Sequence, residues 1–250
     1  MTKSQKLYFS LDVLLYPLLF VVLMWLVFWF EIRFGRDFTS YGIHPGRIEG
    51  LRGILFGPFI HGNLKHLFNN SIPMLVLGSA LFYFYRPVRW HVLILGFLIT
   101  GFITWCIGRP ADHIGASGIV YVLASFLFFK GIISKQYQLT ALSFAVVFVY
   151  GSLFWYVFPT DSQISWEGHL SGFCVGVLLA FLYKGTNTLT NKKYEWEAEN
   201  YSPENDPFMQ QFDADGNFIE NKEVLDQESE NSTLKKDVNV IYTIVNQKKD

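Results

Sequence analysis

Six stretches of this 250-residue chain contain no Asp, Glu, Lys or Arg, and they restrict its fold more than any other feature. An α-helix rises about 1.5 Å per residue, so about 20 apolar residues cross a hydrocarbon core roughly 30 Å thick. Somewhat shorter stretches suffice when flanking side chains snorkel or the bilayer thins. The pattern predicts an all-α polytopic membrane protein with six transmembrane helices. The six stretches are Val13–Phe30, His66–Tyr85, Trp90–Gly108, His113–Phe129, Gln136–Thr160 and Gly168–Tyr183.

Charge divides the chain into two unlike parts. Residues 1–185 hold 13 Lys/Arg against 7 Asp/Glu, a net charge of +6, whereas residues 186–250 hold 7 against 14, a net charge of −7. The first part is the predicted membrane domain, and the second is a polar, acidic and largely disordered tail in which Val238–Val245 has the pattern of a β-strand. A hydrophobic content of 51% excludes a disordered chain, and the lack of a strongly basic block excludes nucleic acid as a partner.

The Lys/Arg distribution predicts the orientation. With the N-terminus inside, nine of these residues fall on the inner side and six on the outer side, which favours cytoplasmic positions for both termini. Residues 31–60, approximately, then form a long outer loop, whose glycines and prolines predict turns and short helical pieces. The first apolar stretch lacks a clear cleavage site and is a better span than a signal peptide. We expect an integral protein of a bacterial plasma (inner) membrane.

Polar residues gather near the beginnings of the second, fourth and sixth stretches. His66 and Asn70 lie in the second, Ser117 in the fourth and His169 in the sixth. These three spans run in the same direction, from outside to inside, so their first residues lie at the same face of the membrane. The helical rise brings all four groups within about 8 Å of one depth. Polar groups inside a membrane are expensive, and this convergence predicts a functional site.

The residue types predict nucleophilic catalysis. A serine hydroxyl needs a base to become a nucleophile, and a neutral imidazole is the usual base near pH 7, so Ser117 and His169 form a candidate pair. Glu167 points away from His169 on a helix, which predicts a dyad rather than a triad. His66 and Asn70 share a helix face and, with the Ser117 N–H, are candidate donors to an oxyanion. His61, at the end of the loop, is a candidate for orienting those donors.

Glycines fit the same arrangement. Gly115 and Gly118 flank Ser117 and allow another part of the chain to approach its backbone closely. Gly168, Gly172 and Gly176 recur every four residues on the sixth span, a pattern that lets transmembrane helices pack tightly. Close packing of the sixth span on the fourth would bring His169 to Ser117.

Each of these features, taken alone, also occurs in membrane proteins without catalytic activity. A membrane serine commonly bonds the carbonyl four residues before it, a lone histidine commonly packs in a core, and an asparagine can join two helices. A transporter that conducts protons through His66, His113 and His169 would need acidic residues within the spans and internal repeats, and neither occurs. Cys106 and Cys174 form neither a disulfide framework nor a metal site by spacing, so we expect no cofactor and no metal.

Three motifs carry a resemblance to a known family. His61 to Asn70 (HGNLKHLFNN) matches HGxxxHxxxN on the second span, Gly115–Gly118 matches GxSG on the fourth, and Gly168–Gly172 (GHLSG) matches the histidine motif of the sixth. In this order, they make residues 11–185 resemble the rhomboid intramembrane serine proteases. The resemblance departs at Leu51-Arg52, where the family often has Trp-Arg.

The resemblance implies an endopeptidase with a Ser117 nucleophile, a His169 base and an oxyanion site formed by His66, Asn70 and the Ser117 N–H. Its substrates would be single-span membrane proteins in the lipid bilayer, cut near the outer end of their helix after lateral entry between spans two and five. Hydrolysis would need a water-filled cavity lined by His61, His66, Asn70 and Ser117. The alternative is a catalytically silent relative that binds membrane proteins, but such relatives lose the serine or the histidine.

Overall fold

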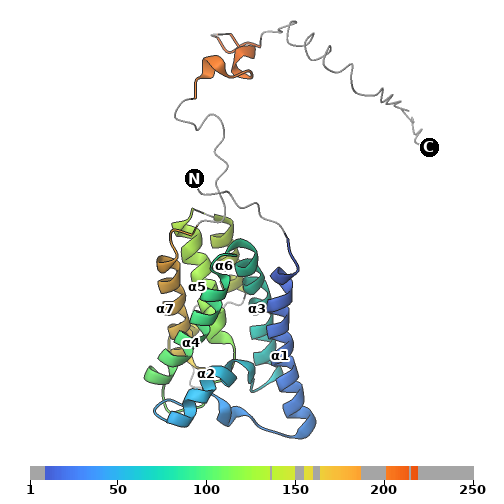
Figure 1. Ribbon diagram of the computed structural model, residues 1–250, viewed down its shortest axis with the longest axis vertical. Coiled ribbons are helices and arrows are strands. Elements are labelled where there is room, and N and C mark those ends of the chain that lie inside the picture. Colours follow the sequence, from blue (N-terminus) through green and yellow to red (C-terminus); the bar gives the residue numbers. More distant parts are fainter. Residues whose placement is uncertain are drawn as a thin grey trace, which may run out of the picture. The chain divides into compact units, whose positions relative to one another are not determined.

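The computed structural model describes residues 9–135, 137–149, 155–159, 164–186, 201–213 and 215–218 of the chain. The chain divides into two units, Met1–Thr190 and Asn191–Asp250. Within the described residues the fold is helical, and β-pairing is limited to isolated bridges. The α-helices (Figure 1) are α1 (Asp12–Phe34), α2 (Gly53–Phe56), α3 (Leu64–Phe84), α4 (Arg89–Ile107), α5 (Ser117–Ile133), α6 (Tyr137–Val149) and α7 (Trp166–Leu182). Short 3₁₀ helices span Thr39–Tyr41, Ile48–Arg52, Gly57–Phe59, Trp155–Val157, Pro203–Asn205 and Met209–Gln211.

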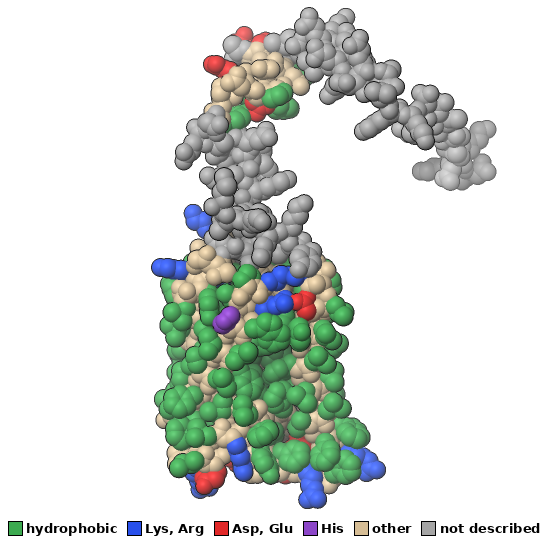
Figure 2. All heavy atoms as spheres, in the orientation of Figure 1, with side chains coloured by type: hydrophobic (Ala, Val, Ile, Leu, Met, Phe, Trp, Pro, Cys, Tyr) green, Lys and Arg blue, Asp and Glu red, His purple; other side chains and the backbone are tan. Residues whose placement is uncertain are grey.

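The first unit is an integral membrane domain, as the length of its apolar helices and its hydrophobic surface indicate. One of its long helices overlaps each of the six uncharged stretches, and α1, α3 and α4 are long and apolar enough to cross a bilayer. Helices α5 and α7 are apolar and have 17 residues each, whereas part of the fifth stretch lies outside the described residues. Figure 2 shows hydrophobic side chains covering the visible face of the bundle, with Lys and Arg near its two ends. This surface matches a hydrocarbon layer bounded by polar interfaces.

Two element boundaries differ from the sequence expectation. Helix α1 continues past Glu31 to Phe34, so the long loop starts later than predicted. Helix α5 begins at Ser117 rather than at His113. The cause is Gly115, whose φ of +98° is incompatible with a right-handed helix and turns the chain immediately before the serine.

Helix α5 forms the centre of the bundle and packs most closely on α7. All its residues from Ile119 to Leu127 are buried. A Cβ atom added at Gly172 of α7 would lie 2.1 Å from the carbonyl oxygen of Gly118, and one at Gly176 would lie 2.0 Å from the Ser125 hydroxyl. Glycine at these positions therefore lets the two backbones touch, as the four-residue repeat predicts.

The other end of this helix pair is held by a buried cation. Lys130 of α5 is completely buried, and its Nζ donates to the carbonyls of Tyr183 and Lys184 at 2.8 and 2.9 Å. These carbonyls follow the last turn of α7, where the helix dipole favours positive charge. Lys130 thus fastens the C-terminal end of α7 to α5.

Helix α1 packs on α3 at the side of the bundle. Pro17 of α1 contacts Gly78, where an added Cβ would lie 3.1 Å from the proline ring. Trp25 donates from Nε1 to the Ser71 hydroxyl at 3.0 Å. Asp12 of α1 pairs with Arg89 at the start of α4 at 2.5 Å. These contacts place α3, and with it the HGNLKHLFNN motif, against the rest of the bundle.

The second unit contains one small described motif. Asp206 accepts hydrogen bonds from the Tyr201 hydroxyl and the Phe208 amide, both at 2.8 Å, and an isolated bridge joins Phe212 to Phe218. The predicted strand at 238–245 lies outside the described residues. Asp213 likewise accepts from the amides of Asp215 and Asn217, so the motif consists of local turns organised by aspartates.

We expect Gly172→Ala to lower the free energy of unfolding by about 1–3 kcal/mol, because the new methyl group meets backbone rather than a movable side chain. The matched control is Gly185→Ala, since nothing lies within 4 Å of a Cβ atom at Gly185. Denaturant unfolding in detergent micelles measures both variants. Equal stabilities for the two would show that the α5–α7 contact is looser than described.

Candidate active site

The first turns of α5 and α7 bring a serine and a histidine together. Ser117 is the first residue of α5 and His169 lies in the first turn of α7. Ser117 Oγ and His169 Nε2 are 2.8 Å apart, although the residues are separated by 52 positions in the chain. The distance is that of a nucleophile hydrogen-bonded to its base. The two expected catalytic residues are thus neighbours.

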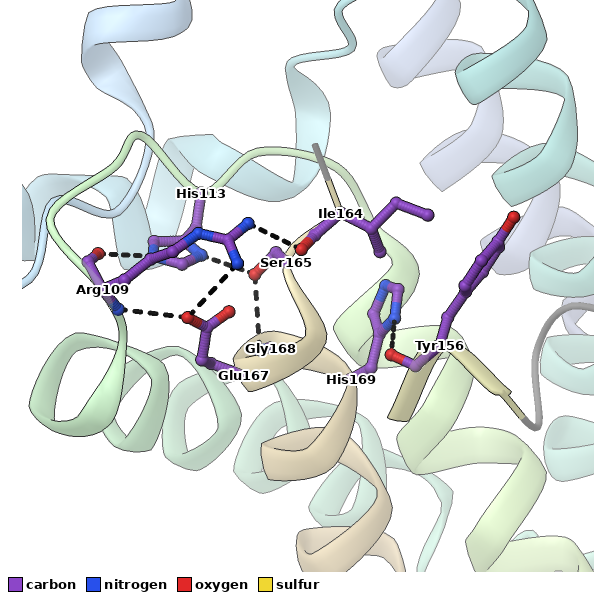
Figure 3. Close-up of polar contacts among 8 residues, drawn as sticks. All are labelled: Arg109, His113, Tyr156, Ile164, Ser165, Glu167, Gly168 and His169. Carbon is purple, nitrogen blue, oxygen red and sulfur yellow. Dashed lines mark hydrogen bonds and ion pairs between the residues drawn. The ribbon is translucent and has the colours of Figure 1, made fainter. Parts of the chain in front are cut away.

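A backbone carbonyl fixes the tautomer of His169. Nδ1 of His169 lies 2.9 Å from the carbonyl oxygen of Tyr156, in the 3₁₀ helix that precedes α7 (Figure 3). A carbonyl only accepts, so Nδ1 carries the proton and Nε2 accepts from the Ser117 hydroxyl. The Tyr156 carbonyl occupies the place that a carboxylate takes in a catalytic triad. A main-chain atom has no sequence signature, so the motifs did not predict it.

Tyr121 supports the same imidazole from the side. It lies one turn after Ser117 on α5, and its ring stacks on the His169 ring with centroids 4.4 Å apart and planes 18° from parallel. The stacked ring restricts rotation of His169 out of line with Ser117. The spacing of four residues from the serine is the signal that could have predicted this contact.

His66 and Asn70 converge on the chain just before Ser117. A Cβ atom at Gly115 would lie 2.6 Å from the His66 ring and 3.4 Å from Asn70 Nδ2, so only glycine leaves room for both side chains. Asn70 Nδ2 donates one hydrogen bond to the His66 carbonyl at 3.2 Å, which leaves its second N–H for another acceptor. The two side chains from α3 therefore stand beside the segment that carries the nucleophile.

His61 lies behind His66. Its ring is buried and meets the His66 ring edge-on, with centroids 5.0 Å apart. Nδ1 is 3.3 Å from the Phe59 carbonyl, to which it donates, and Nε2 has no hydrogen-bond partner among the described residues. Burial, with a smaller effect of the neighbouring His66, lowers the pKa of His61 to about 3. His61 is therefore a neutral residue placed to orient His66.

The long loop between α1 and α3 holds the segment before Ser117 in place. Ile43 and His113 exchange two backbone hydrogen bonds at 2.8 and 2.9 Å, and the Gly115 amide donates to the Gly57 carbonyl at 2.9 Å. Ile54 of α2 packs where a Cβ at Gly101 of α4 would be only 2.7 Å away. The loop is thus part of the site's framework and is packed against α4.

Comparison with known proteins gives the family. The family model of the rhomboid domain matches residues 49–185. The chain belongs to the rhomboid family. An uncharacterized protein of Mycobacterium tuberculosis is 37% identical over 176 residues, which cover 66% of this chain and 72% of that protein. A Bacillus subtilis protein named "Putative rhomboid protease YdcA" is 28% identical over 193 residues, 70% of this chain and 92% of that protein. The predicted family is confirmed.

The residues expected to form the rhomboid site all lie within the matched region and near the starts of α3, α5 and α7. Glu167 faces Arg109 on the loop before α5, whose amide and guanidinium both approach its Oε1. In the part of the chain that the structure describes, the two nitrogens of His169 thus contact the Tyr156 carbonyl and the Ser117 hydroxyl, and no carboxylate bonds to it. The expected site residues are Ser117, His169, His66, Asn70, His61, Gly115 and Gly118.

A cavity of about 40 Å³ adjoins the serine of this rhomboid, large enough for water. Its polar lining consists of Ser117, Thr100, Thr104, His113 and Ser165, so it lies on the α4 side of the serine. The sequence predicts a cavity lined by His61, His66, Asn70 and Ser117, and of these four Ser117 lines this one. The α4 hydroxyls were not predicted because a threonine in an apolar helix usually bonds its own backbone, as Thr104 does.

No cluster of three or more His, Cys, Asp or Glu suited to a metal ion occurs in the described part of the rhomboid chain. Cys106 and Cys174 are both exposed and unpaired as thiols.

The low pKa of His61 predicts acid sensitivity. Below its ordinary value of 6.5 the unfolded chain protonates this histidine, whereas the folded protein keeps it neutral down to about 3. The unfolded state then binds more protons, so stability falls by up to about 1.4 kcal/mol for each pH unit between those values. His61→Phe should flatten this slope in denaturant unfolding. His91→Phe, at an exposed histidine of α4, is the control, and identical slopes in all three proteins would contradict the assignment.

Proposed function

We propose that this rhomboid is an intramembrane serine endopeptidase that cuts single-span membrane proteins near the outer end of their transmembrane segment. The observation that carries the proposal is the 2.8 Å contact between Ser117 Oγ and His169 Nε2, with His169 Nδ1 bonded to the Tyr156 carbonyl. This arrangement has the nucleophile, the base and the group that orients the base. Both residues whose loss would mark a silent, binding-only relative are present and in contact.

The reaction follows from these positions. Ser117 Oγ attacks the scissile carbonyl carbon while its proton moves to His169 Nε2. The imidazolium that forms is stabilised by the Tyr156 carbonyl through its Nδ1–H. The oxyanion accepts hydrogen bonds from the ring N–H of His66, the free N–H of Asn70 and the Ser117 amide. His169 then protonates the departing amine, which leaves an acyl group on Ser117.

Water completes the cycle. The cavity beside Ser117 is large enough for water and has hydroxyl groups in its lining. A water that enters from it is deprotonated by His169 and attacks the acyl carbon, which releases the second product and restores the serine. The site would otherwise lie in a layer that excludes water.

The topology we propose has six membrane spans, α1, α3, α4, α5, α6 and α7, with both termini in the cytoplasm of a bacterium and the protein in its plasma membrane. Support comes from the excess of Lys and Arg on the inner side and from bacterial relatives. The starts of α3, α5 and α7 then face the outside, and the acidic tail faces the cytoplasm. Substrates enter laterally from the bilayer.

Ser117→Ala and His169→Ala should each reduce cleavage by at least about 10³-fold. The assay uses the purified protein in lipid vesicles with a reporter protein that has one transmembrane segment. Ser125→Ala is the matched control, because Ser125 lies on the same helix but bonds the Tyr121 carbonyl. Fluorophosphonate should label the wild type at Ser117. Cleavage that persists in Ser117→Ala would refute the protease assignment, and absent cleavage and labelling in the wild type would favour a binding-only rhomboid.

Asn70→Ala should lower kcat by about 10²–10³-fold and leave KM nearly unchanged, because the oxyanion exists only in the transition state. Asn69→Ala is the matched control, since Asn69 is its neighbour on α3 but is exposed. Both variants are measured with the same reporter over a range of substrate concentrations. A rise in KM at constant kcat would instead place Asn70 in ground-state binding.

A further inference from the structure

A polar network joins the loop before α5 to the first turn of α7. We define the loop–helix network as Arg109 and His113 of the loop with Ser165 and Glu167 at the start of α7 (Figure 3). The Arg109 amide donates to Glu167 Oε1 at 3.2 Å, and Arg109 Nη2 donates to the Ile164 carbonyl at 2.7 Å. The network therefore bonds main chain and side chains across a gap in sequence of more than 50 residues.

Glu167 is a buried carboxylate at the centre of this network. Its side chain is 2% exposed, and Arg109 Nη1 lies 3.8 Å from its Oε1. Its Oε2 has no hydrogen-bond partner among the described residues. A buried carboxylate is costly unless a cation and donors compensate it, and Arg109 supplies both a guanidinium and an amide donor. The loop and the first turn of α7 are thus tied by a charge as well as by hydrogen bonds.

His113 makes the second connection. Its Nε2 donates to the Arg109 carbonyl at 3.0 Å, so its Nδ1 accepts from the Ser165 hydroxyl at 2.5 Å. Burial lowers the pKa of His113, which keeps the ring neutral. The Ser165 oxygen in turn accepts from the Gly168 amide at 3.3 Å and caps the N-terminus of α7. His113 therefore orients the residue at which α7 begins.

The bonds of the network lie close to the reacting groups along the chain. Arg109 and His113 precede Ser117 by eight and four residues, and Glu167 precedes His169 by two. The glycine contacts between α5 and α7 lie deeper in the bundle, at Gly172 and Gly176. These glycine contacts set the separation of the helix axes. The loop–helix network sets the rotation of the first turn of α7 and its position along the helix axis.

We propose that Arg109, His113 and Glu167 are positioning residues that hold His169 within hydrogen-bond distance of Ser117. The inference rests on the proposed serine-protease function. None of the three needs to touch substrate. Weakening the network should tilt the first turn of α7 and lengthen the Ser117–His169 contact, and a misplacement of about 1 Å costs roughly 10²-fold in rate.

The test compares Glu167→Ala, Glu167→Gln and Asp112→Ala with the wild type in vesicles. Glutamine keeps an oxygen for the Arg109 amide, whereas alanine removes it. Asp112→Ala is the matched control, because Asp112 lies on the same loop but pairs with His44 at 2.9 Å. Fluorophosphonate titration of Ser117 counts active sites, so kcat is expressed per titrated site and misfolded protein is discounted. Imidazole ¹⁵N NMR of His169 reports the contact with Ser117 without requiring turnover, with Ser117→Ala as the reference for a broken contact.

Glu167→Ala should lower kcat about 100-fold at constant KM, and its His169 signals should move towards those of Ser117→Ala. Glu167→Gln should recover part of the lost kcat and part of the wild-type His169 signal positions. Asp112→Ala should match the wild type in both measurements. His169 signals in Glu167→Ala that equal those of the wild type would overturn the positioning role, whether or not the protein cleaves the reporter. Failure of the wild type to cleave or to be labelled would count against the protease function alone, since the NMR comparison still tests the network.

Discussion

The contact between the backbones of α5 and α7 is the constraint on which the site depends. Gly172 lets α7 approach the Gly118 carbonyl so closely that any side chain there would collide. Gly118 follows the nucleophile directly, and His169 lies one turn before Gly172, so a small separation of these helices would break the serine–histidine contact. Lys130 holds the far end of the same pair, where it bonds the carbonyls after α7. The serine–histidine contact is thus held by one helix pair, α5 and α7, whose separation is fixed at both ends.

Backbone carbonyls take over a task that acidic side chains perform in many hydrolases. The Tyr156 carbonyl fixes the tautomer of His169, and the Arg109 carbonyl does the same for His113. A carbonyl cannot be protonated at ordinary pH and carries no net charge, so it orients an imidazole at little desolvation cost. In an apolar layer this choice avoids a second buried carboxylate beside the dyad. Glu167, a carboxylate buried nearby, is compensated by Arg109.

Much of the helical fold and the core of the site could be predicted from the sequence, because both depend on patterns that can be read along the chain. Uncharged stretches predicted the helices, the repeat of Gly168, Gly172 and Gly176 predicted the close packing, and shared direction of the spans placed Ser117 near His169. Helix ends were predicted less well. The turn at Gly115 starts α5 four residues later than expected, since it depends on a positive φ rather than on polarity.

What could not be predicted depends on contacts between distant parts of the chain. The Tyr156 carbonyl belongs to a segment with no motif, and the pairing of Arg109 with Glu167 joins residues 58 positions apart. The α4 hydroxyls that line the cavity beside Ser117 carry no motif. The position of this cavity follows from how the long loop packs on α4, where Ile54 meets Gly101.

The distance of 52 positions between Ser117 and His169 in the chain also sets an order of events during synthesis. The ribosome completes the nucleophile first and the base later, and at about 5–20 residues per second the interval is roughly 3–10 s. During this interval Ser117 lies in a chain that still lacks His169 and the first turn of α7. In the proposed mechanism, a nascent molecule therefore has a base beside Ser117 only after the first turn of α7 has packed on α5, and shorter nascent chains cannot activate this serine.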